Sequence, residues 1–448
     1  MVFYFYLLLF VLCYSSDLFE EYYKDAEEKM KNMTMEERIG QIFFPRFHLK
    51  NSTDDITNKK PGGFMLFAND FEFNASFIQE YIINIKNLSK QIMGLPLGLA
   101  VDEEGGKVNR VSIKHRSEVF PSPQEIYNKS GIDGILKIDQ EKRDLLRKFF
   151  LNINLAPVAD LSYNPKDYIF GRTIGRHTKE AANYIAKDVE GYVNDNFTCT
   201  LKHFPGYGNN SDTHTGISID DRTYEIFQDE DLKVFQAGIN NKAPIVLVSH
   251  NIVTCNDNKY PASLSKIWHD ILRDELNFSG LIMTDDMSMG AIKQYAGNVS
   301  EAVLAINAGN DIILTSDYYM HYDAVIKAYK NREISENLIN NACKRILAWK
   351  FKYLMKNDSQ HIEPSDEPVE PTGVPIEPTG KPVEPTSKPA KPEENKCNSA
   401  LIVLLVLLGV IIVGVAITLV IILRKNRLKK SNLDGEKLNK DFPDSAII

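Results

Sequence analysis

The sequence predicts an α/β fold for residues 16–356, and within that class a (β/α)8 TIM-type barrel. Two observations support this prediction. Short apolar runs alternate with longer amphipathic stretches, as strands alternate with helices, and acidic or imidazole side chains follow one apolar run after another. About eight such strands alternating with helices favour a barrel over an open sheet, and a barrel demands that its chemistry lie just past the C-terminal ends of its strands, where these polar residues occur.

The predicted strands are short apolar runs bounded by polar, glycine or proline residues. There are about eight of them: Ile39–Phe44, Gly63–Phe67, Leu97–Val101, Ile153–Val158, Thr198–Lys202, Pro244–Val248, Leu281–Thr284 and Asp311–Leu314. Amphipathic stretches typical of helices lie between or around them: Asp17–Lys31, Ser76–Gln91, Thr178–Asn194, Asp229–Asn240 and Ser335–Lys352.

Polar side chains follow most of the predicted strands. Strand ends that face water are often polar, so each residue taken singly is unremarkable. So many acids and imidazoles at successive strand ends nevertheless indicate a site: Asp102-Glu103-Glu104, Asp160, Lys202-His203, Ser249-His250, Asp285-Asp286 and Ser316-Asp317.

The segment from Lys202 to His214 gathers a cation, two imidazoles and a carboxylate in a stretch rich in Gly, Pro and Asn. These residue types predict one loop. Asp212 and His214 lie two residues apart, so the carboxylate can orient the imidazole and raise its proton affinity. A histidine that acts as acid and base near neutral pH needs such a partner.

Two separated acidic groups and an imidazole suit hydrolysis of a glycosidic bond. The chain has no Cys/His metal spacing and no phosphate-binding Gly-rich loop, so we expect neither a metal nor another cofactor. Asp285 is our choice of nucleophile because it is the first acid after the apolar run ending at Thr284. Asp286 is the close alternative, although it can also cap the segment that follows.

The two ends of the chain predict targeting segments. Residues 1–15 are rich in aromatic residues and leucine and predict a secretory signal peptide, with a hydrophobic anchor or core segment as the alternative. Residues 357–398 repeat Pro, Thr and charged residues and predict a disordered stalk.

A second apolar segment lies near the C-terminus. Residues 399–423 contain an apolar run long enough for a membrane-spanning helix, and basic residues follow it in the segment 424–448. The positive-inside rule places that tail in the cytoplasm. The sequence therefore predicts a single-pass type I membrane protein of the plasma membrane or a lysosome-like compartment, with its catalytic domain extracellular or lumenal.

The net charge, the cysteines and the glycosylation sequons indicate which kinds of partner and compartment to expect. The net charge is −8, which gives no indication of a nucleic-acid partner. The five cysteines are scattered and form no disulfide framework. About ten Asn-x-Ser/Thr sequons are consistent with a glycosylated, secreted face.

Ordered motifs between about Met35 and Ala348 resemble glycoside hydrolase family 3, in its single-domain β-N-acetylhexosaminidase branch. The motifs are Met35-Glu36-Glu37-Arg38-Ile39-Gly40-Gln41, Pro61-Gly62-Gly63, Ala100–Arg110, Phe120-Pro121-Ser122-Pro123, Leu155–Asp160, Lys202–His214, Pro261-Ala262-Ser263-Leu264-Ser265 and Met283–Met289.

The resemblance implies a retaining double displacement on a (β/α)8 barrel. Asp285 matches the nucleophile, and His214, held by Asp212, matches the acid/base. The resemblance also implies that sugar hydroxyls are bound by five residues: Asp102, Arg110, Arg172, Lys202 and His203. The expected substrate is a terminal β-linked N-acetylglucosamine, and peptidoglycan fragments are one candidate source.

The end of the predicted barrel favours this branch over the β-glucosidases and β-xylosidases that it resembles. Those relatives usually take an acidic acid/base from a second domain, whereas here the stalk follows directly. The chain departs from the branch at Lys107, Tyr207 and Thr213, where Arg, His and Ser are common, and its dyad loop is one residue shorter. A β-glucosidase, a glycoside phosphorylase and a non-catalytic surface lectin or adhesin therefore stay open as alternatives.

Overall fold

The computed structural model describes residues 17–355 except 211–215, 217, 294 and 296–298. The predicted signal peptide, stalk, membrane helix and tail (1–15, 357–398, 399–423 and 424–448) lie outside the described residues.

Parallel strands form the centre of the fold. A six-stranded parallel sheet has the order β2-β3-β4-β5-β7-β9, and β1 pairs in parallel with β10. The strands are β1 (Phe43–Pro45), β2 (Gly63–Leu66), β3 (Gly98–Val101), β4 (Ile153–Asn154), β5 (Thr198–Phe204), β7 (Ile245–Val248), β9 (Leu281–Thr284) and β10 (Ile313–Thr315). A small parallel pair, β6 (Ile219–Asp220) and β8 (Ile252–Val253), lies apart from these strands in the pairing.

Two isolated parallel bridges connect the β1–β10 pair to the six-stranded sheet. Arg46, which follows β1, bridges to Met65 of β2, and Met283 of β9 bridges to Ile312, which precedes β10. The pairing therefore runs from β1 through β2 to β9 and β10. The predicted α/β fold with a parallel sheet is confirmed.

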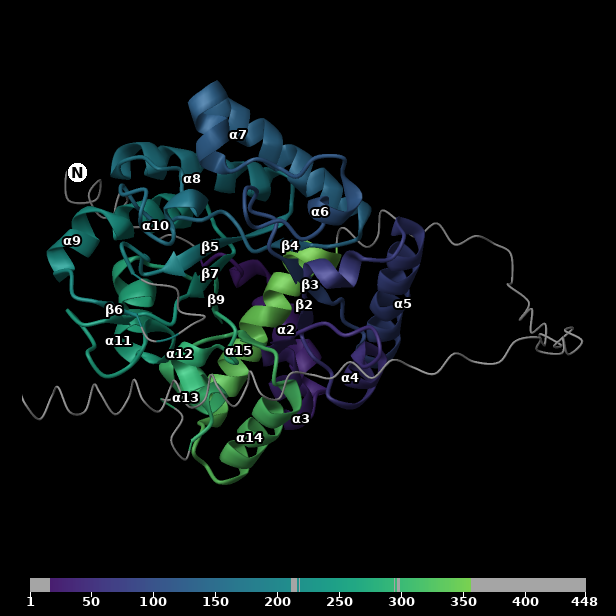
Figure 1. Cartoon of the computed structure of the whole chain (residues 1–448). Helices are drawn as coiled ribbons and strands as arrows, with labels where there is room; N and C mark the ends of the chain where they lie inside the picture. The colour runs from purple at the N-terminus through teal and green to yellow at the C-terminus, as the bar shows by residue number, and fades with distance from the viewer. Residues whose placement is uncertain (1–16, 211–215, 217, 294, 296–298, 356–448) are drawn as a thin grey trace, which may run out of the picture. The chain divides into compact units, whose positions relative to one another are not determined.

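Helices lie around the strands, as Figure 1 shows for α5, α7, α8, α10 and α14. The helices are α2 (Tyr23–Lys31), α3 (Met35–Ile42), α4 (Ser52–Asn58), α5 (Ala75–Met93), α6 (Ser112–His115), α7 (Pro123–Lys148), α8 (Thr178–Asn194), α9 (Tyr224–Asp229), α10 (Asp231–Asn240), α11 (Lys266–Asp270), α12 (Gly290–Lys293), α13 (Glu301–Ala308), α14 (Tyr318–Lys330) and α15 (Glu336–Trp349). Short helical turns, among them η2 (Ala68–Phe71) and η3 (Phe170–Arg172), connect them.

One predicted strand is mostly helix. The prediction of a strand over Ile39–Phe44 is wrong, because α3 continues to Ile42 and β1 begins only at Phe43. A capping box starts this helix: the Thr34 side chain accepts a hydrogen bond from the Glu37 N–H, and the Glu37 carboxylate accepts one from the Thr34 N–H. Such a cap stabilises the first helical turn against competing extended structure.

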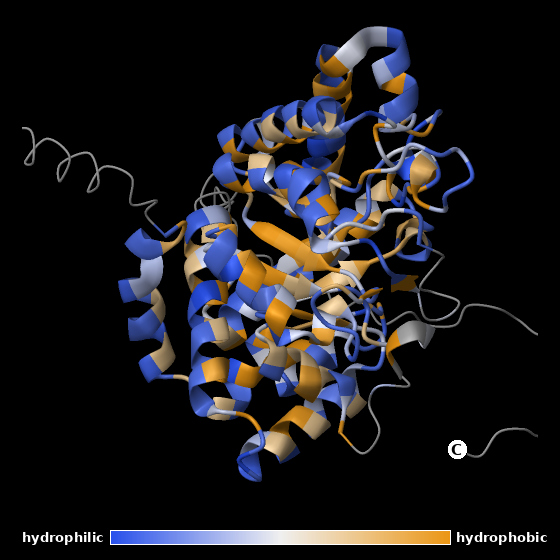
Figure 2. Cartoon of the chain, turned by 90° about the vertical axis from the view of Figure 1, so that its left-hand side faces the viewer, coloured by the Kyte–Doolittle hydropathy of each residue, from blue (hydrophilic) through white to orange (hydrophobic). Residues whose placement is uncertain are grey.

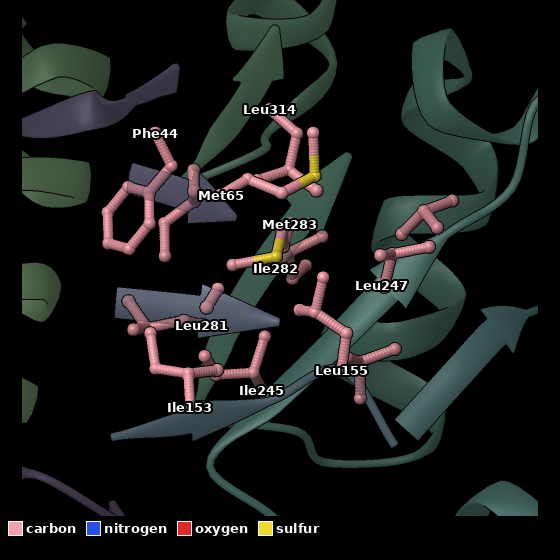
Figure 3. Packing of buried hydrophobic residues seen from close by; sticks show 14 of the residues in the cluster. Phe44, Met65, Ile153, Leu155, Ile245, Leu247, Leu281, Ile282, Met283 and Leu314 are labelled. Carbon is pink, nitrogen blue, oxygen red and sulfur yellow. The ribbon is translucent and has the colours of Figure 1, made fainter. Parts of the chain in front are cut away.

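Apolar side chains from the strands fill the centre. Figure 3 shows Phe44, Met65, Ile153, Ile245 and Leu281 converging between strands that are far apart in the sequence. All five side chains are buried, so the hydrophobic effect holds the strands together. Figure 2 shows the complementary pattern, with apolar residues concentrated on the central strands and polar residues on the outer faces of the helices.

The predicted membrane localisation is corrected by the structure. Within the part of the chain that the structure describes, no helix is long and apolar enough to cross a membrane. The two long helices α5 and α7 are amphipathic, and α7 in particular carries many charged residues. We therefore withdraw the single-pass assignment. The segment on which it rested, 399–423, lies outside the described residues.

Candidate active site

Four of the predicted site residues, Asp102, Lys202, His203 and Asp285, lie at or next to the C-terminal ends of parallel strands. Asp102 follows β3 directly, and Asp285 follows β9. Lys202 and His203 were predicted at the beginning of a loop, but β5 continues to Phe204, so both are strand residues. The peptide bond between them is cis. The neighbouring strands thus bring these residues to one edge of the sheet.

Lys202 lies between two carboxylates. Its Nζ atom is 2.6 Å from Asp102 Oδ1 and 2.6 Å from Glu104 Oε1. Arg172, at the end of η3, donates to both oxygens of Glu104, with distances of 2.9 and 2.7 Å. Such bidentate, charge-assisted pairs fix geometry as well as adding energy.

Opposite charges keep this cluster ionised although it is buried. Burial alone would raise the pKa of Glu104, but Arg172 and Lys202 hold that pKa well below its usual range. Burial alone would lower the pKa of Lys202, whereas the charges of Asp102 and Glu104 raise it. Glu104 and Lys202 are therefore charged at neutral pH.

The two ring nitrogens of His203 contact a carboxylate, Asp160, and a guanidinium, Arg172. Its Nδ1 atom is 2.7 Å from Asp160 Oδ2, and its Nε2 atom is 3.2 Å from Arg172 Nη2. Because a guanidinium only donates, Nε2 must accept, and Nδ1–H donates to Asp160. Asp160 also accepts the backbone N–H of Tyr207 at 2.8 Å. The imidazole is thus fixed in one orientation and one tautomer.

Arg110 borders the same cluster. Its Nη2 atom is 4.0 Å from Asp102 Oδ2, and its Cζ atom is 5.7 Å from the centre of the Phe67 ring. Its Nε atom is buried and has no hydrogen-bond partner among the described residues. The Arg110 side chain as a whole is 27% exposed, so part of it borders solvent beside the cluster.

The two acids after β9 have different surroundings. The Asp286 carboxylate accepts hydrogen bonds from the backbone N–H of Ser288 at 2.9 Å and of Ser316 at 3.0 Å, and from the Ser316 hydroxyl. These contacts give Asp286 a structural role. Asp285 Oδ1 accepts the N–H of Asp286 at 2.8 Å. Asp285 thus follows β9 directly, while Asp286 is tied to Ser316, which follows β10.

Asp212 and His214 lie outside the described residues. The residues on either side of that segment are tied together: Ser218 Oγ donates to Asn210 Oδ1 at 3.0 Å, and Asn210 Nδ2 donates to Asp220 Oδ2 at 2.9 Å. Asn210 Nδ2 also donates to the Tyr207 carbonyl at 2.7 Å. Asn210 and Ser218, which flank the undescribed residues, are therefore linked to each other and Asn210 to Tyr207.

Comparison with known proteins supplies the family. The family model described as the glycosyl hydrolase family 3 N terminal domain matches residues 34–349. The chain belongs to glycosyl hydrolase family 3.

Curated relatives agree with this assignment. A β-hexosaminidase of Haemophilus influenzae is 32% identical over 282 residues, which cover 61% of this chain and 77% of the relative. A β-hexosaminidase of Xylella fastidiosa is 29% identical over 305 residues, which cover 66% and 88%.

A solved structure resembles the fold. The family 3 β-N-acetylglucosaminidase from a Paenibacillus strain has a TM-score of 0.68 and 26% identity, and the match covers 72% of this chain and 63% of that one. The chain thus spans less than two thirds of the Paenibacillus protein. Together the relatives identify the chain as a glycoside hydrolase similar to the β-N-acetylhexosaminidases.

Two residues of this family 3 site were missing from the predicted set. Glu104 pairs with both Arg172 and Lys202, and Asp160 orients His203. Their positions after predicted strands were a signal for both, but only the contacts distinguish them from acids that face solvent. Within the described ranges no group of three or more His, Cys, Asp or Glu side chains is arranged to hold a metal ion.

Proposed function

We propose that this family 3 hydrolase is a retaining exo-β-N-acetylhexosaminidase that removes terminal β-linked N-acetylglucosamine. The observation that carries the proposal is the buried cluster of Asp102, Glu104, Arg172, Lys202 and His203 at the C-terminal ends of the strands. Alternating acids and bases of this kind suit the hydroxyl groups of a sugar, each of which donates and accepts. The ring of strands is interpreted as a (β/α)8 barrel, in which active sites occupy this edge.

In the proposed mechanism Asp285 attacks the anomeric carbon and forms a covalent glycosyl-enzyme. His214, oriented by Asp212, protonates the leaving oxygen and then deprotonates the water that releases the sugar. The five residues Asp102, Arg110, Arg172, Lys202 and His203 bind hydroxyl groups of the sugar. Peptidoglycan fragments are one candidate source of the substrate, by analogy with the family alone.

The first test compares sugars and acceptors. The purified protein is assayed with an aryl β-N-acetylglucosaminide and an aryl β-glucoside, each with and without phosphate. We expect hydrolysis of the acetamido sugar that does not depend on phosphate. Faster cleavage of the glucoside would contradict the sugar assignment, and turnover only with phosphate would make the protein a phosphorylase.

The second test identifies the nucleophile with a matched pair of variants. Asp285→Asn should lose more than about a thousandfold in kcat because a neutral amide cannot attack, while folding is unchanged. Asp286→Asn changes the neighbouring acid in the same way and should keep activity within about tenfold of wild type. Full activity of Asp285→Asn, or a larger loss in Asp286→Asn, would overturn the assignment.

A further inference from the structure

Glu103 lies between two proposed site residues but has no part in the mechanism above. Its side chain is fully buried. The carboxylate accepts the backbone N–H of Arg110 at 3.0 Å and of Val111 at 2.7 Å. It also accepts from Ser112, through the backbone N–H at 3.4 Å and through the hydroxyl. One carboxylate therefore collects donors from three consecutive residues.

The backbone of Glu103 is fixed to the sheet by Asn154 of β4. Asn154 Oδ1 accepts the Glu103 N–H at 3.0 Å, and Asn154 Nδ2 donates to the Glu103 carbonyl at 3.2 Å. Asn154 Nδ2 also lies 2.8 Å from the hydroxyl of the buried Tyr192. The backbone of Glu103 is therefore held by β4, while its carboxylate is held by residues 110–112.

The contacts of Glu103 connect the two ends of the loop that joins Asp102 to Arg110. At the start of this loop Asp102 follows β3, and its carboxylate pairs with Lys202. At the end of the loop the Arg110 guanidinium lies 4.0 Å from the same carboxylate. Within the loop, the N–H groups of Glu104 and Gly105 donate to the Val108 carbonyl at 3.0 Å. Without the Glu103 carboxylate, the described hydrogen bonds to the backbone N–H of Arg110 would be lost.

We propose that Glu103 is a positioning residue that sets the Arg110 guanidinium for sugar binding. The proposal rests on the proposed role of Arg110 in binding a sugar hydroxyl. Three of the partners of the carboxylate oxygens are backbone N–H groups, which only donate, and this suits a group that only accepts. A glutamine of the same shape would replace one of the two acceptor oxygens by an NH2 group that faces the Ser112 N–H or the N–H groups of Arg110 and Val111, so the contacts that hold the turn carrying Arg110 would weaken.

A double-mutant cycle tests this coupling. Glu103→Gln and Arg110→Gln are measured singly and together with the aryl β-N-acetylglucosaminide. We expect each single variant to raise KM by about tenfold to a hundredfold with kcat within about threefold of wild type. Because Glu103 acts through Arg110, the double variant should have the KM of Arg110→Gln alone.

Two further variants control for effects on folding. Glu72→Gln makes the same change at an exposed acid that pairs with Lys114 of α6 at 3.4 Å, and should leave KM unchanged. Ser112→Ala removes one donor to Glu103 and should raise KM by about threefold, an effect that also disappears with Arg110→Gln. If Glu103→Gln does not fold, the double-mutant cycle of Ser112→Ala with Arg110→Gln tests the positioning role instead.

The outcomes separate the inference from the function on which it rests. If Arg110→Gln leaves KM unchanged, Arg110 does not bind the sugar and both proposals for it fail. If Arg110→Gln raises KM but the Glu103 or Ser112 change multiplies it further in the double variant, only the positioning role is overturned. A fall in kcat at unchanged KM would also contradict that role.

Discussion

Replacing Glu104 by glutamine tests how strongly the charge cluster stabilises the fold. Only 2% of the Glu104 side chain is exposed, and it receives two hydrogen bonds from Arg172 and one ion pair from Lys202. The glutamine keeps the shape and removes the negative charge, so Arg172 loses its paired carboxylate, while Lys202 keeps Asp102 and loses Glu104. Removing one partner of a buried ion pair costs about 3–5 kcal/mol.

The expected loss can be converted into a melting temperature. Unfolding entropy is about 2.1 cal/mol/K per residue, so a domain of about 340 residues changes by roughly 0.7 kcal/mol/K. The Glu104→Gln variant should then melt about 4–7 °C below wild type. Urea unfolding followed by circular dichroism measures the free energy, and a thermal scan measures the temperature.

The dependence on pH gives an independent check. The folded-state pKa of Glu104 is held below its ordinary value of 4.5. Its ionised form therefore contributes stability that is present above about pH 4.5 and is lost as the pH falls through the folded-state pKa. The difference between wild type and Glu104→Gln should be constant from pH 5 to pH 8 and should shrink in stronger acid.

The matched control is Glu28→Gln, which makes the same change in a surface ion pair. The Glu28 side chain is 68% exposed and pairs with Lys31, so we expect a change below about 0.5 kcal/mol. A loss below about 1 kcal/mol in Glu104→Gln at pH 7 would refute the reasoning, because the buried charge would then have no more effect than the exposed one.

Two other predictions concern the acid/base and a buried lysine. His214→Ala should slow substrates with poor leaving groups at least tenfold more than activated aryl glycosides, which need little protonation; equal losses would exclude His214 as the acid. Burial lowers the pKa of Lys350, whose Nζ donates at 2.7 Å to Gln41 Oε1, from 10.5 to about 7. Its contribution to stability should therefore be complete above about pH 10.5 and fall as the pH drops to 7, by up to about 1.4 kcal/mol per unit. Urea unfolding at pH 7, 8 and 9 should show a slope in wild type that is absent in Lys350→Met, and identical slopes would contradict this prediction.

Local sequence patterns were sufficient to predict the bounds of some helices and strands. The predicted helix Thr178–Asn194 and the predicted strand Leu281–Thr284 agree with α8 and β9 in both bounds. The helical period of the apolar residues identifies the first, and the second is a short apolar run bounded by Gly280 and the acids Asp285 and Asp286. The strand predicted over Ile39–Phe44 failed because a short apolar run does not distinguish strand from helix, and the capping box at Thr34 decides for helix.

The sequence by itself determined the alternation of helices and strands, the positions of polar residues after the strands and the motifs of family 3. Those features depend on residue type and spacing along the chain. The tertiary structure alone decided which acids meet which bases. The Asp286 carboxylate accepts a hydrogen bond from Ser316, thirty residues away, which indicates a structural role. Glu104 belongs to the cluster because it pairs with Arg172, sixty-eight residues away. Such pairs arise because distant strand ends meet at one edge of the sheet, and spacing along the chain does not specify those distances.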